Sequence, residues 1–307
     1  MKLLWLDLNS SYAHSSLALP ALHAQIADDT TIEWCIVSAT INENTGMVVS
    51  RIHKHRPDII AATNWLFNHE QLLHIISRAK ALLPHCCIVL GGPEFLGNNE
   101  AFLYKNKFVS GVFRGEGEEV FPQWLKVWNH SKETWKAITG LCYLDENGRY
   151  QDNGIARVMN FSQLVSPEKS CFFNWSKPFV QLETTRGCFN TCAFCVSGGE
   201  KPVRTIPLEA IRERLNDIHQ HGIKNVRVLD RTFNYNNKRA KELLHLFREY
   251  APDICFHLEI HPALLSEELK EELAVLPSGL LHLEAGIQSL REPVLEKSRR
   301  IGKLSDA

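Results

Sequence analysis

The chain has 307 residues, of which 44% are hydrophobic, and a formal net charge of −1. This size and composition allow substantial buried cores and predict two globular domains. Because 34 basic side chains are balanced by 35 acidic ones, no general attraction to nucleic acid or to an acidic membrane surface is indicated. The apolar start of the chain is interrupted by Asp7 and is too short for a secretory signal or a membrane span. We therefore expect a cytoplasmic protein with no membrane partner.

Residues 1–128 alternate short apolar runs with segments of helical periodicity, which is typical of a parallel sheet covered on both faces. Between the third and fourth predicted strands, apolar residues recur at helical spacing and Asn68 is a plausible N-cap. The predicted fold class is α/β, beginning with a doubly wound (flavodoxin-like) domain. Its predicted strands are 3–8, 33–37, 58–63, 86–90 and 111–113.

Residues 129–178 break this alternation. Two turn sequences, at 145–148 and 152–154, follow a short apolar run, and two prolines come later. We interpret this segment as a hairpin followed by a linker.

The alternation resumes at residue 179 and continues to the end of the chain. Pro207 suits the first position of a predicted helix, and Ser266 is a predicted N-cap. The segment 179–307 therefore predicts a second βα domain with four βα steps. Its predicted strands are 179–182, 225–229, 254–260 and 280–285, with helices between them.

Cys188, Cys192 and Cys195 follow the first of these strands with the spacing C-x3-C-x2-C. Three thiolates can hold three irons of a 4Fe-4S cluster and leave the fourth iron open to a ligand. A zinc site would need a fourth ligand, and the next histidine, His219, lies on a predicted helix. A disulfide is the less favoured alternative, because nine cysteines without a secretory signal indicate a reducing compartment.

The cysteine motif, with the aromatic Phe194 just before its last cysteine, resembles that of radical S-adenosylmethionine (SAM) enzymes. The resemblance implies a 4Fe-4S cluster that cleaves SAM to a 5'-deoxyadenosyl radical. It also implies a partial radical SAM βα barrel, because only the first four βα units of the family's barrel are present. We therefore expect the chain to be truncated within the barrel.

SAM presents an ammonium, a carboxylate and a ribose, and active-site groups of such barrels lie at the carboxyl ends of the strands. Glu259, Gln288 and Arg300 suit the ammonium and carboxylate by type, and the resemblance carries these three positions over. Asp230 and Glu284 are expected to contact ribose or substrate. The resemblance also implies that Phe194 lies against the adenine.

Ligands of doubly wound sheets bind beyond the carboxyl ends of the strands. The loops at those positions resemble the cobalamin-binding domain that precedes many radical SAM domains. The resemblance implies that cobalamin contacts come from Ser10, Thr63, Gly91, Gly92, Glu94, Gly115 and Glu116. A tight turn is the alternative reason for the paired glycines.

One departure from the cobalamin-binding pattern lies after the first strand. Residues 7–12 contain no histidine where the family's methyltransferase-type domains carry the cobalt ligand. We therefore expect cobalamin without a lower axial histidine, with His14 as a further loop residue that could face the corrin.

These resemblances imply a cobalamin-dependent radical SAM enzyme that transfers a methyl group to an unactivated carbon or rearranges it. Its expected partners are a small-molecule or peptide substrate and a reductase or flavodoxin-type electron donor. Two alternatives stay open. One is a methylthiotransferase-like enzyme that modifies RNA, which would need further cluster-binding cysteines in the first domain. The other is a truncated cofactor-binding module without turnover.

Overall fold

The computed structural model describes residues 1–13, 16–197 and 200–302. The chain divides into two compact units. The first comprises Met1–Asn160 with Leu164–Phe173, and the second comprises Phe161–Gln163 with the chain from Asn174 onward. His14 lies outside the described residues.

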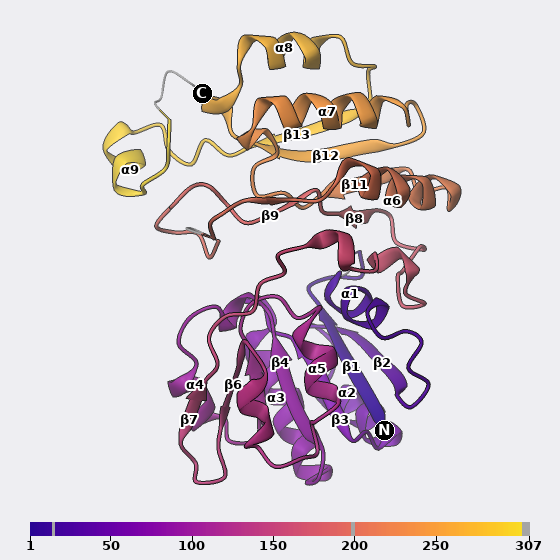
Figure 1. Cartoon of the computed structure of the whole chain (residues 1–307), viewed down its shortest axis with the longest axis vertical. Coiled ribbons are helices and arrows are strands. Elements are labelled where there is room, and N and C mark those ends of the chain that lie inside the picture. Colours follow the sequence, from indigo (N-terminus) through magenta and orange to yellow (C-terminus); the bar gives the residue numbers. More distant parts are fainter. Residues whose placement is uncertain (14–15, 198–199, 303–307) are drawn as a thin grey trace. The chain divides into compact units, whose positions relative to one another are not determined.

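The first unit is built on a sheet with the strand order β2-β1-β3-β4-β5-β6-β7 (Figure 1). Strands β1 to β5 are parallel, and their order is that of a flavodoxin-like sheet. The strands are β1 (Lys2–Asn9), β2 (Glu33–Thr40), β3 (Ile59–Thr63), β4 (Cys87–Gly91), β5 (Gly111–Phe113), β6 (Leu141–Leu144) and β7 (Tyr150–Asp152). The predicted fold class is confirmed.

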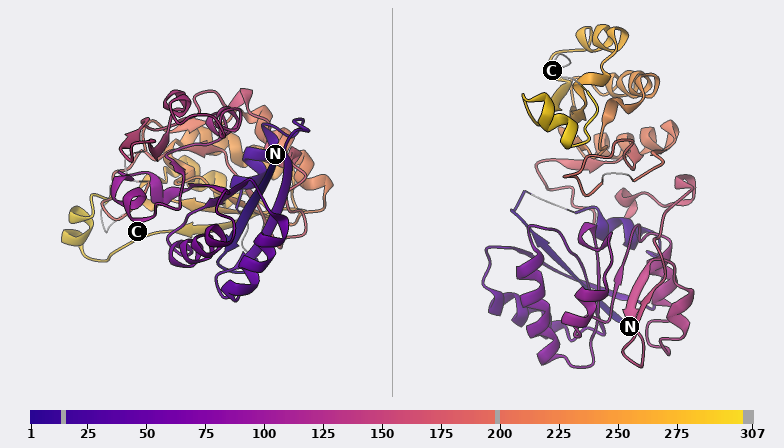
Figure 2. Two further views of the ribbon diagram at one scale, coloured as in Figure 1. Left: turned by 90° about the horizontal axis from the view of Figure 1, so that it is seen from below. Right: turned by 90° about the vertical axis from the view of Figure 1, so that its left-hand side faces the viewer.

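Helices cover both faces of this sheet, as the right-hand view of Figure 2 shows. Leu4, Leu6 and Leu8 of β1 belong to one core with residues of α2, α3 and α4, whereas Leu3 and Trp5 belong to a second core with residues of α1 and α5. This alternation along a central strand buries apolar side chains on both sides. The helices are α1 (Ala18–Ala24), α2 (Thr45–His55), α3 (His69–Leu82), α4 (Glu100–Lys105) and α5 (Val120–Leu125).

The hairpin predicted around residues 145–148 is present as β6 and β7 and is part of the first unit. Strand β6 pairs antiparallel with β5, so the hairpin extends the parallel sheet at its edge. Trp135 beside it is 3% exposed and contacts the rings of Trp124 and Tyr143.

Asn68 occupies the predicted N-cap position of helix α3, and its carbonyl accepts the N–H of Leu72 at 2.7 Å. Its side chain makes no cap hydrogen bond. Instead its amide nitrogen donates to the carbonyls of Leu8 and Thr63, at 2.9 and 3.1 Å, and its oxygen accepts from the backbone N–H of Trp65. Asn68 is 1% exposed, and buried carbonyls need partners, so its side chain joins the ends of β1 and β3 rather than the helix start.

The second unit contains a parallel sheet of four strands in the order β13-β12-β11-β8. A separate antiparallel pair is formed by β9 and β10, which come between β8 and β11 in the chain. The strands are β8 (Val180–Leu182), β9 (Thr185–Arg186), β10 (Arg204–Thr205), β11 (Asn225–Val228), β12 (Cys255–Ile260) and β13 (Leu281–Ala285).

Helices of the second unit supply buried apolar residues for one face of its sheet. Phe247 of α7 stacks on Phe256 of β12, with ring centroids 4.1 Å apart. Ser266 caps α8 as predicted, by accepting from the N–H of Leu269. Helix α6 begins at Leu208, so Pro207 is its N-cap rather than its first residue as predicted. The helices are α6 (Leu208–Gln220), α7 (Asn237–Arg248), α8 (Glu267–Ala274) and α9 (Glu292–Lys297).

Six short 3-10 helices complete the described secondary structure. They are η1 (Pro93–Phe95), η2 (Thr134–Ala137), η3 (Phe161–Gln163), η4 (Pro167–Lys169), η5 (Phe233–Tyr235) and η6 (Pro262–Leu264). None of the helices in the described ranges has the length and apolarity needed to cross a lipid bilayer.

Candidate functional site

The three motif cysteines lie on one loop of the second unit, from residue 187 to 203, which we call the cysteine loop. The antiparallel strands β9 and β10 close its base, with Arg186 opposite Arg204. Gly187 has φ +98°, and a Cβ there would lie 2.5 Å from the carbonyl oxygen of Glu200. The N–H of Cys188 donates to that same carbonyl at 3.0 Å. The two arms of the loop are thus tied together immediately before the first cysteine.

Two further contacts hold the cysteine loop at the carboxyl ends of the barrel strands. The ring of Phe189 meets His261, which follows β12, edge to face at 6.5 Å. The N–H of Ala193 donates to the carbonyl of Ser298, just after α9, at 2.9 Å. The motif therefore lies at the strand ends where barrel active sites are built.

The three thiols differ in exposure. Cys192 is buried, Cys188 is half-buried and Cys195 is exposed. Burial, together with the neighbouring Cys195 and Cys192 thiols, raises the pKa of Cys188. Within the described residues no three potential ligands converge on one point that would suit a metal ion. The donor set fits a cluster by its chemistry and by its place on one short loop, although the three thiols do not converge on a common point in this structure.

A row of polar side chains lies on one face of the four-stranded sheet, and we call it the polar face. Strand register places Arg227 of β11 beside His257 of β12, and Glu259 of β12 beside Glu284 of β13. The alternate residues of β11 and β12, such as Val226 and Phe256, are buried. The polar face comprises Gln181, Arg227, His257, Glu259, His282 and Glu284.

Arg227 organises two of the predicted site carboxylates. Its guanidinium lies 3.2 Å from Glu259 and 3.8 Å from Glu284. The ring of His257 lies 2.9 Å from Glu284 and stacks on His282. Sequence reasoning missed Arg227 and the two histidines, although the alternation of apolar and polar residues in these strands was the available signal.

Gln288 and Arg300, both predicted to contact SAM, meet around Gly286 at the end of β13. The Arg300 guanidinium donates to the carbonyl of Gly286 at 2.5 Å. A Cβ at Gly286 would lie 2.5 Å from the Gln288 amide nitrogen and 3.7 Å from an Arg300 nitrogen. Phe194 is 58% exposed on the cysteine loop. The structure therefore brings Gln288 and Arg300 together and leaves the Phe194 ring available to a ligand.

Asp230, also predicted to contact ribose or substrate, is 1% exposed. Its carboxylate accepts the backbone N–H groups of Thr184 and Thr185 and the hydroxyl of Thr184. Burial raises the pKa of Asp230, against the effect of these hydrogen bonds. The carboxylate is thus bonded to the chain itself.

In the first unit, the predicted cobalamin contacts lie at or just after the carboxyl ends of β1, β3, β4 and β5. Thr63 pairs in register with Gly91, so two of these positions are neighbours at one edge. Ser10 and Glu94 are half-buried at the same strand ends. Tyr12 and Leu66 follow the adjacent strands β1 and β3 and are 82% and 81% exposed, so this edge also presents apolar surface.

Gly115 and Glu116, also predicted to contact cobalamin, have a role within the first unit itself. The N–H of Glu116 donates to the Ala156 carbonyl at 3.0 Å, and its carboxylate accepts from the N–H of Val158 at 2.7 Å. A Cβ on Gly115 would lie 2.2 Å from the Ala156 carbonyl oxygen. Gly115 and Glu116 thus hold residues 156–158 beside β5.

Gly92 is required by the turn after β4. It has φ +111° and ψ 177°, a region that only glycine adopts readily, and a Cβ would lie 2.5 Å from the carbonyl oxygen of Asn64. We expect Gly92→Ala to lower the free energy of unfolding of the first unit by at least about 2 kcal/mol. Urea titration followed by tryptophan fluorescence measures this loss.

Gly148→Ala is the matched control, because Gly148 has φ +74° but a Cβ there would meet nothing within 4 Å. It should cost only about 1 kcal/mol. Equal losses in the two variants would contradict the account of Gly92 as a point of close backbone approach.

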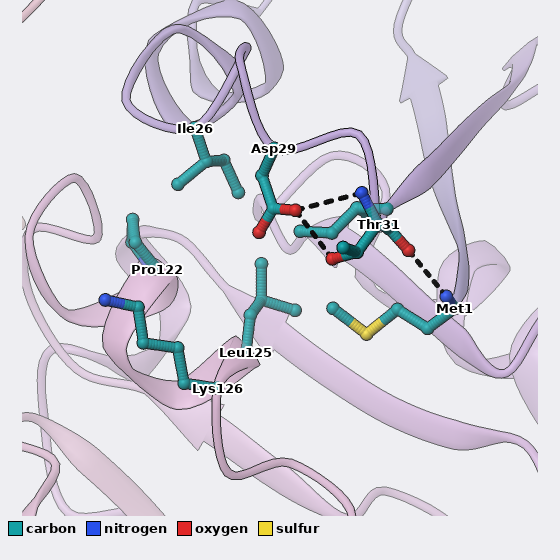
Figure 3. A pocket seen from close by; sticks show the side chains of 8 residues that line it. Met1, Ile26, Asp29, Thr31, Pro122, Leu125 and Lys126 are labelled. Atoms are coloured by element: carbon teal, nitrogen blue, oxygen red, sulfur yellow. Dashed lines mark hydrogen bonds between the residues drawn. The ribbon is translucent and has the colours of Figure 1, made fainter.

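A pocket of about 380 Å³ lies at the other end of the first unit's strands (Figure 3). The Met1 ammonium donates to the Thr31 carbonyl there, and Asp29 accepts from the N–H and hydroxyl of Thr31. Apolar side chains such as Ile26 and Leu125 line the rest. No predicted site residue lines this pocket.

Together, the fold and the loop define a two-domain α/β protein in which a doubly wound sheet precedes a partial βα barrel with a three-cysteine loop. Residues 8–125 match the B12 binding domain, and residues 182–307 match the Radical SAM superfamily. The chain belongs to the radical SAM proteins that carry an N-terminal B12-binding domain.

Relatives by sequence include a protein of Pyrococcus horikoshii named as an uncharacterised methyltransferase. It is 27% identical over 254 residues, which cover 80% of this chain and 54% of the relative. The cobalamin-dependent radical SAM methyltransferase TokK of Streptomyces tokunonensis is 21% identical over 63% of this chain and 30% of its own length. The chain thus spans about half the length, or less, of these relatives.

Solved structures show the same fold. The cobalamin-dependent SAM radical enzyme OxsB, with aqua-cobalamin and SAM bound, matches 99% of this chain and 46% of its own, with a TM-score of 0.79 and 17% identity. The radical SAM methyltransferase TsrM of Kitasatospora setae matches 99% of this chain and 64% of its own, with a TM-score of 0.75 and 17% identity.

Proposed function

We propose that the protein is a cobalamin-dependent radical SAM enzyme that transfers a methyl group to an unactivated carbon, with rearrangement of such a carbon as the alternative outcome. The observation that carries this proposal is the three-thiol loop, tied at its base and held at the carboxyl ends of a parallel barrel sheet. Named methyltransferases among the relatives support the methyl-transfer outcome.

Cys188, Cys192 and Cys195 would ligate three irons of a 4Fe-4S cluster, with the fourth iron left for SAM. Together the cluster, SAM and cobalamin supply one-electron cleavage of SAM to a 5'-deoxyadenosyl radical and a carrier for the methyl group. The task of the chain is to bind and orient these groups and to exclude water.

Glu259 would accept hydrogen bonds from the SAM ammonium, while Arg300 and Gln288 would donate to its carboxylate. Arg227 holds Glu259 in place from the neighbouring strand, at 3.2 Å. Glu284 shares that guanidinium and would face ribose or substrate. The exposed ring of Phe194 would pack on the adenine.

Cobalamin would lie on the carboxyl edge of the first unit, over Ser10, Thr63, Gly91 and Glu94. The exposed apolar side chains of Tyr12 and Leu66 suit a large ring there. Residues 7–12 contain no histidine, and Asn9 within them is bonded to Asp7 at 2.7 Å, so we propose binding without a lower axial histidine.

The substrate would be a small molecule or a peptide, and a reductase or flavodoxin-type protein would supply electrons. All nine cysteines are free. Free thiols and an iron-sulfur cluster both suit a reducing cytoplasm.

The test is anaerobic reconstitution with iron, sulfide and hydroxocobalamin, followed by incubation with a chemical reductant and SAM. The proposal expects 5'-deoxyadenosine to form and the cobalamin absorption spectrum to change in the bound fraction. A chain that binds neither cluster nor cobalamin would contradict it. If the cofactors bind but SAM is not cleaved, the chain is a cofactor-binding module without turnover.

A methylthiotransferase remains the second candidate by similarity. Such an enzyme acting on ribosomal protein uS12, from Moorella thermoacetica, is 27% identical over 46% of this chain. That function needs a second set of cluster ligands in the first domain. Cys86 is 3% exposed, and Cys35 and Cys87 lie within strands β2 and β4, so these thiols do not form such a set on one loop. The methyltransferase is therefore favoured.

A further inference from the structure

The chain changes direction sharply between strand β8 and the cysteine loop. The last rung of the β8–β11 ladder joins the N–H of Leu229 to the carbonyl of Leu182 at 2.8 Å. Past this rung, Thr184 is 0% exposed and Thr185 is 5% exposed, so their backbone N–H groups are buried. Buried N–H groups need acceptors, and here they do not come from β11 backbone.

Asp230, the second residue after β11, supplies these acceptors. One carboxylate oxygen accepts the N–H of Thr184 at 2.8 Å and that of Thr185 at 2.9 Å. The other oxygen accepts the Thr184 hydroxyl. Burying a carboxylate is costly unless it is well bonded, and hydrogen bonds to a charged acceptor are stronger than neutral ones. The carboxylate therefore takes the place of the next rung of the sheet.

The same two threonines connect to both arms of the cysteine loop. The Thr184 carbonyl accepts the N–H of Ile206 on the returning arm at 2.9 Å. Thr185 pairs with Thr205 in the ribbon of β9 and β10. Cys188 follows only three residues after Thr185. A displacement at Thr184 would therefore move both arms of the loop.

We propose that Asp230 is a positioning residue that anchors the root of the cysteine loop to the barrel sheet and so presets the place of the three thiols. The inference rests on the proposed cluster-binding function and replaces the expected contact of Asp230 with ribose or substrate. Asp230 acts through Thr184 and Thr185 and does not touch the cluster.

The first test needs no cofactor. Hydrogen exchange of peptides that contain Thr184 and Thr185 is measured by mass spectrometry in the cofactor-free protein. Asp230→Ala should speed exchange there by more than about tenfold, because it removes several charge-assisted bonds. Asp230→Asn should stay near the wild type, because its amide oxygen can still accept both N–H groups.

The matched control is Asp253→Ala. Asp253 is another bonded carboxylate of this unit, paired with His219 and Lys224 just before β12. Its loss should leave exchange at Thr184 and Thr185 unchanged. Circular dichroism shows whether Asp230→Ala is folded. If it is not, Thr184→Val takes its place, because it removes only the hydroxyl bond. It should speed exchange in the same peptides a few-fold.

The second test uses the reconstituted protein and its electron paramagnetic resonance spectrum. Asp230→Ala should bind less iron or show an altered cluster signal with a smaller change on SAM addition, and Asp230→Asn should restore both. Unchanged exchange and an unchanged signal in Asp230→Ala, or failure of Asp230→Asn to rescue, would overturn the inference. If wild-type protein assembles no cluster, the proposed function fails, while the exchange test still decides whether Asp230 anchors the loop.

Discussion

Replacement of Cys192 by alanine is expected to abolish the iron-sulfur cluster and, with it, cleavage of SAM. Cys192 is the middle thiol of the motif and is 8% exposed, so solvent cannot readily supply a substitute ligand. Substitution of groups that only support metal ligands already lowers metal affinity or activity by about 10- to 100-fold. Loss of a ligand should therefore lower the rate of 5'-deoxyadenosine formation by more than about 100-fold. Iron and sulfide analysis and product chromatography measure the two effects.

Cys255→Ala is the control for this experiment. Cys255 is a half-buried free thiol of the same unit, at the start of β12 and so at the opposite end of the strand from the cysteine loop. Its replacement should leave iron content and SAM cleavage near the wild-type values. If Cys192→Ala retains the wild-type cluster spectrum, the assignment of the ligands is wrong.

Glu259→Gln is expected to weaken SAM binding by about 10- to 100-fold, which corresponds to about 1.5–3 kcal/mol for a hydrogen bond between charged groups. The substitution keeps the shape of the side chain and removes the charge proposed to meet the SAM ammonium. It also releases Arg227, which would remain beside Glu284. Titration of the cluster signal with SAM gives the affinity.

The paired control is Glu272→Gln on the helical side of the same unit. Glu272 lies near Lys241 and His245 and is away from the polar face. Its change should leave SAM affinity as in the wild type, with the cluster content equal in all three proteins. Equal losses in both variants, or none in Glu259→Gln, would remove Glu259 from the proposed site.

Most strands could be predicted from the sequence because each is a short apolar run. A strand of a covered parallel sheet needs such a run wherever it lies in the sheet. Strand β5 has the predicted bounds, and β1 differs by one residue at each end. Similarly, the C-x3-C-x2-C spacing needs no knowledge of the fold to suggest three ligands on one loop. These features depend on local sequence alone.

The direction of a side chain at a strand end could not be predicted in the same way. Asp230 and Asn68 both stand where ligands or caps are expected, yet each bonds to backbone from a distant part of its unit. The need for glycine at position 92 likewise comes from the backbone of Asn64, which lies on the loop after β3. Such contacts depend on how strands are paired, and several residue types could satisfy them.

The polar face is an intermediate case. Its members alternate with buried residues in β11 and β12, so their presence on one side could have been read from the sequence. The register that sets Arg227 between two carboxylates is a property of the assembled sheet.

The most direct test of the account is the electron paramagnetic resonance spectrum of the anaerobically reconstituted and reduced protein, recorded with and without SAM, together with metal analysis. We expect about four irons per chain and a cluster signal that shifts when SAM binds to the open iron. Bound zinc in place of iron, or a cluster signal that SAM leaves unchanged, would contradict the account.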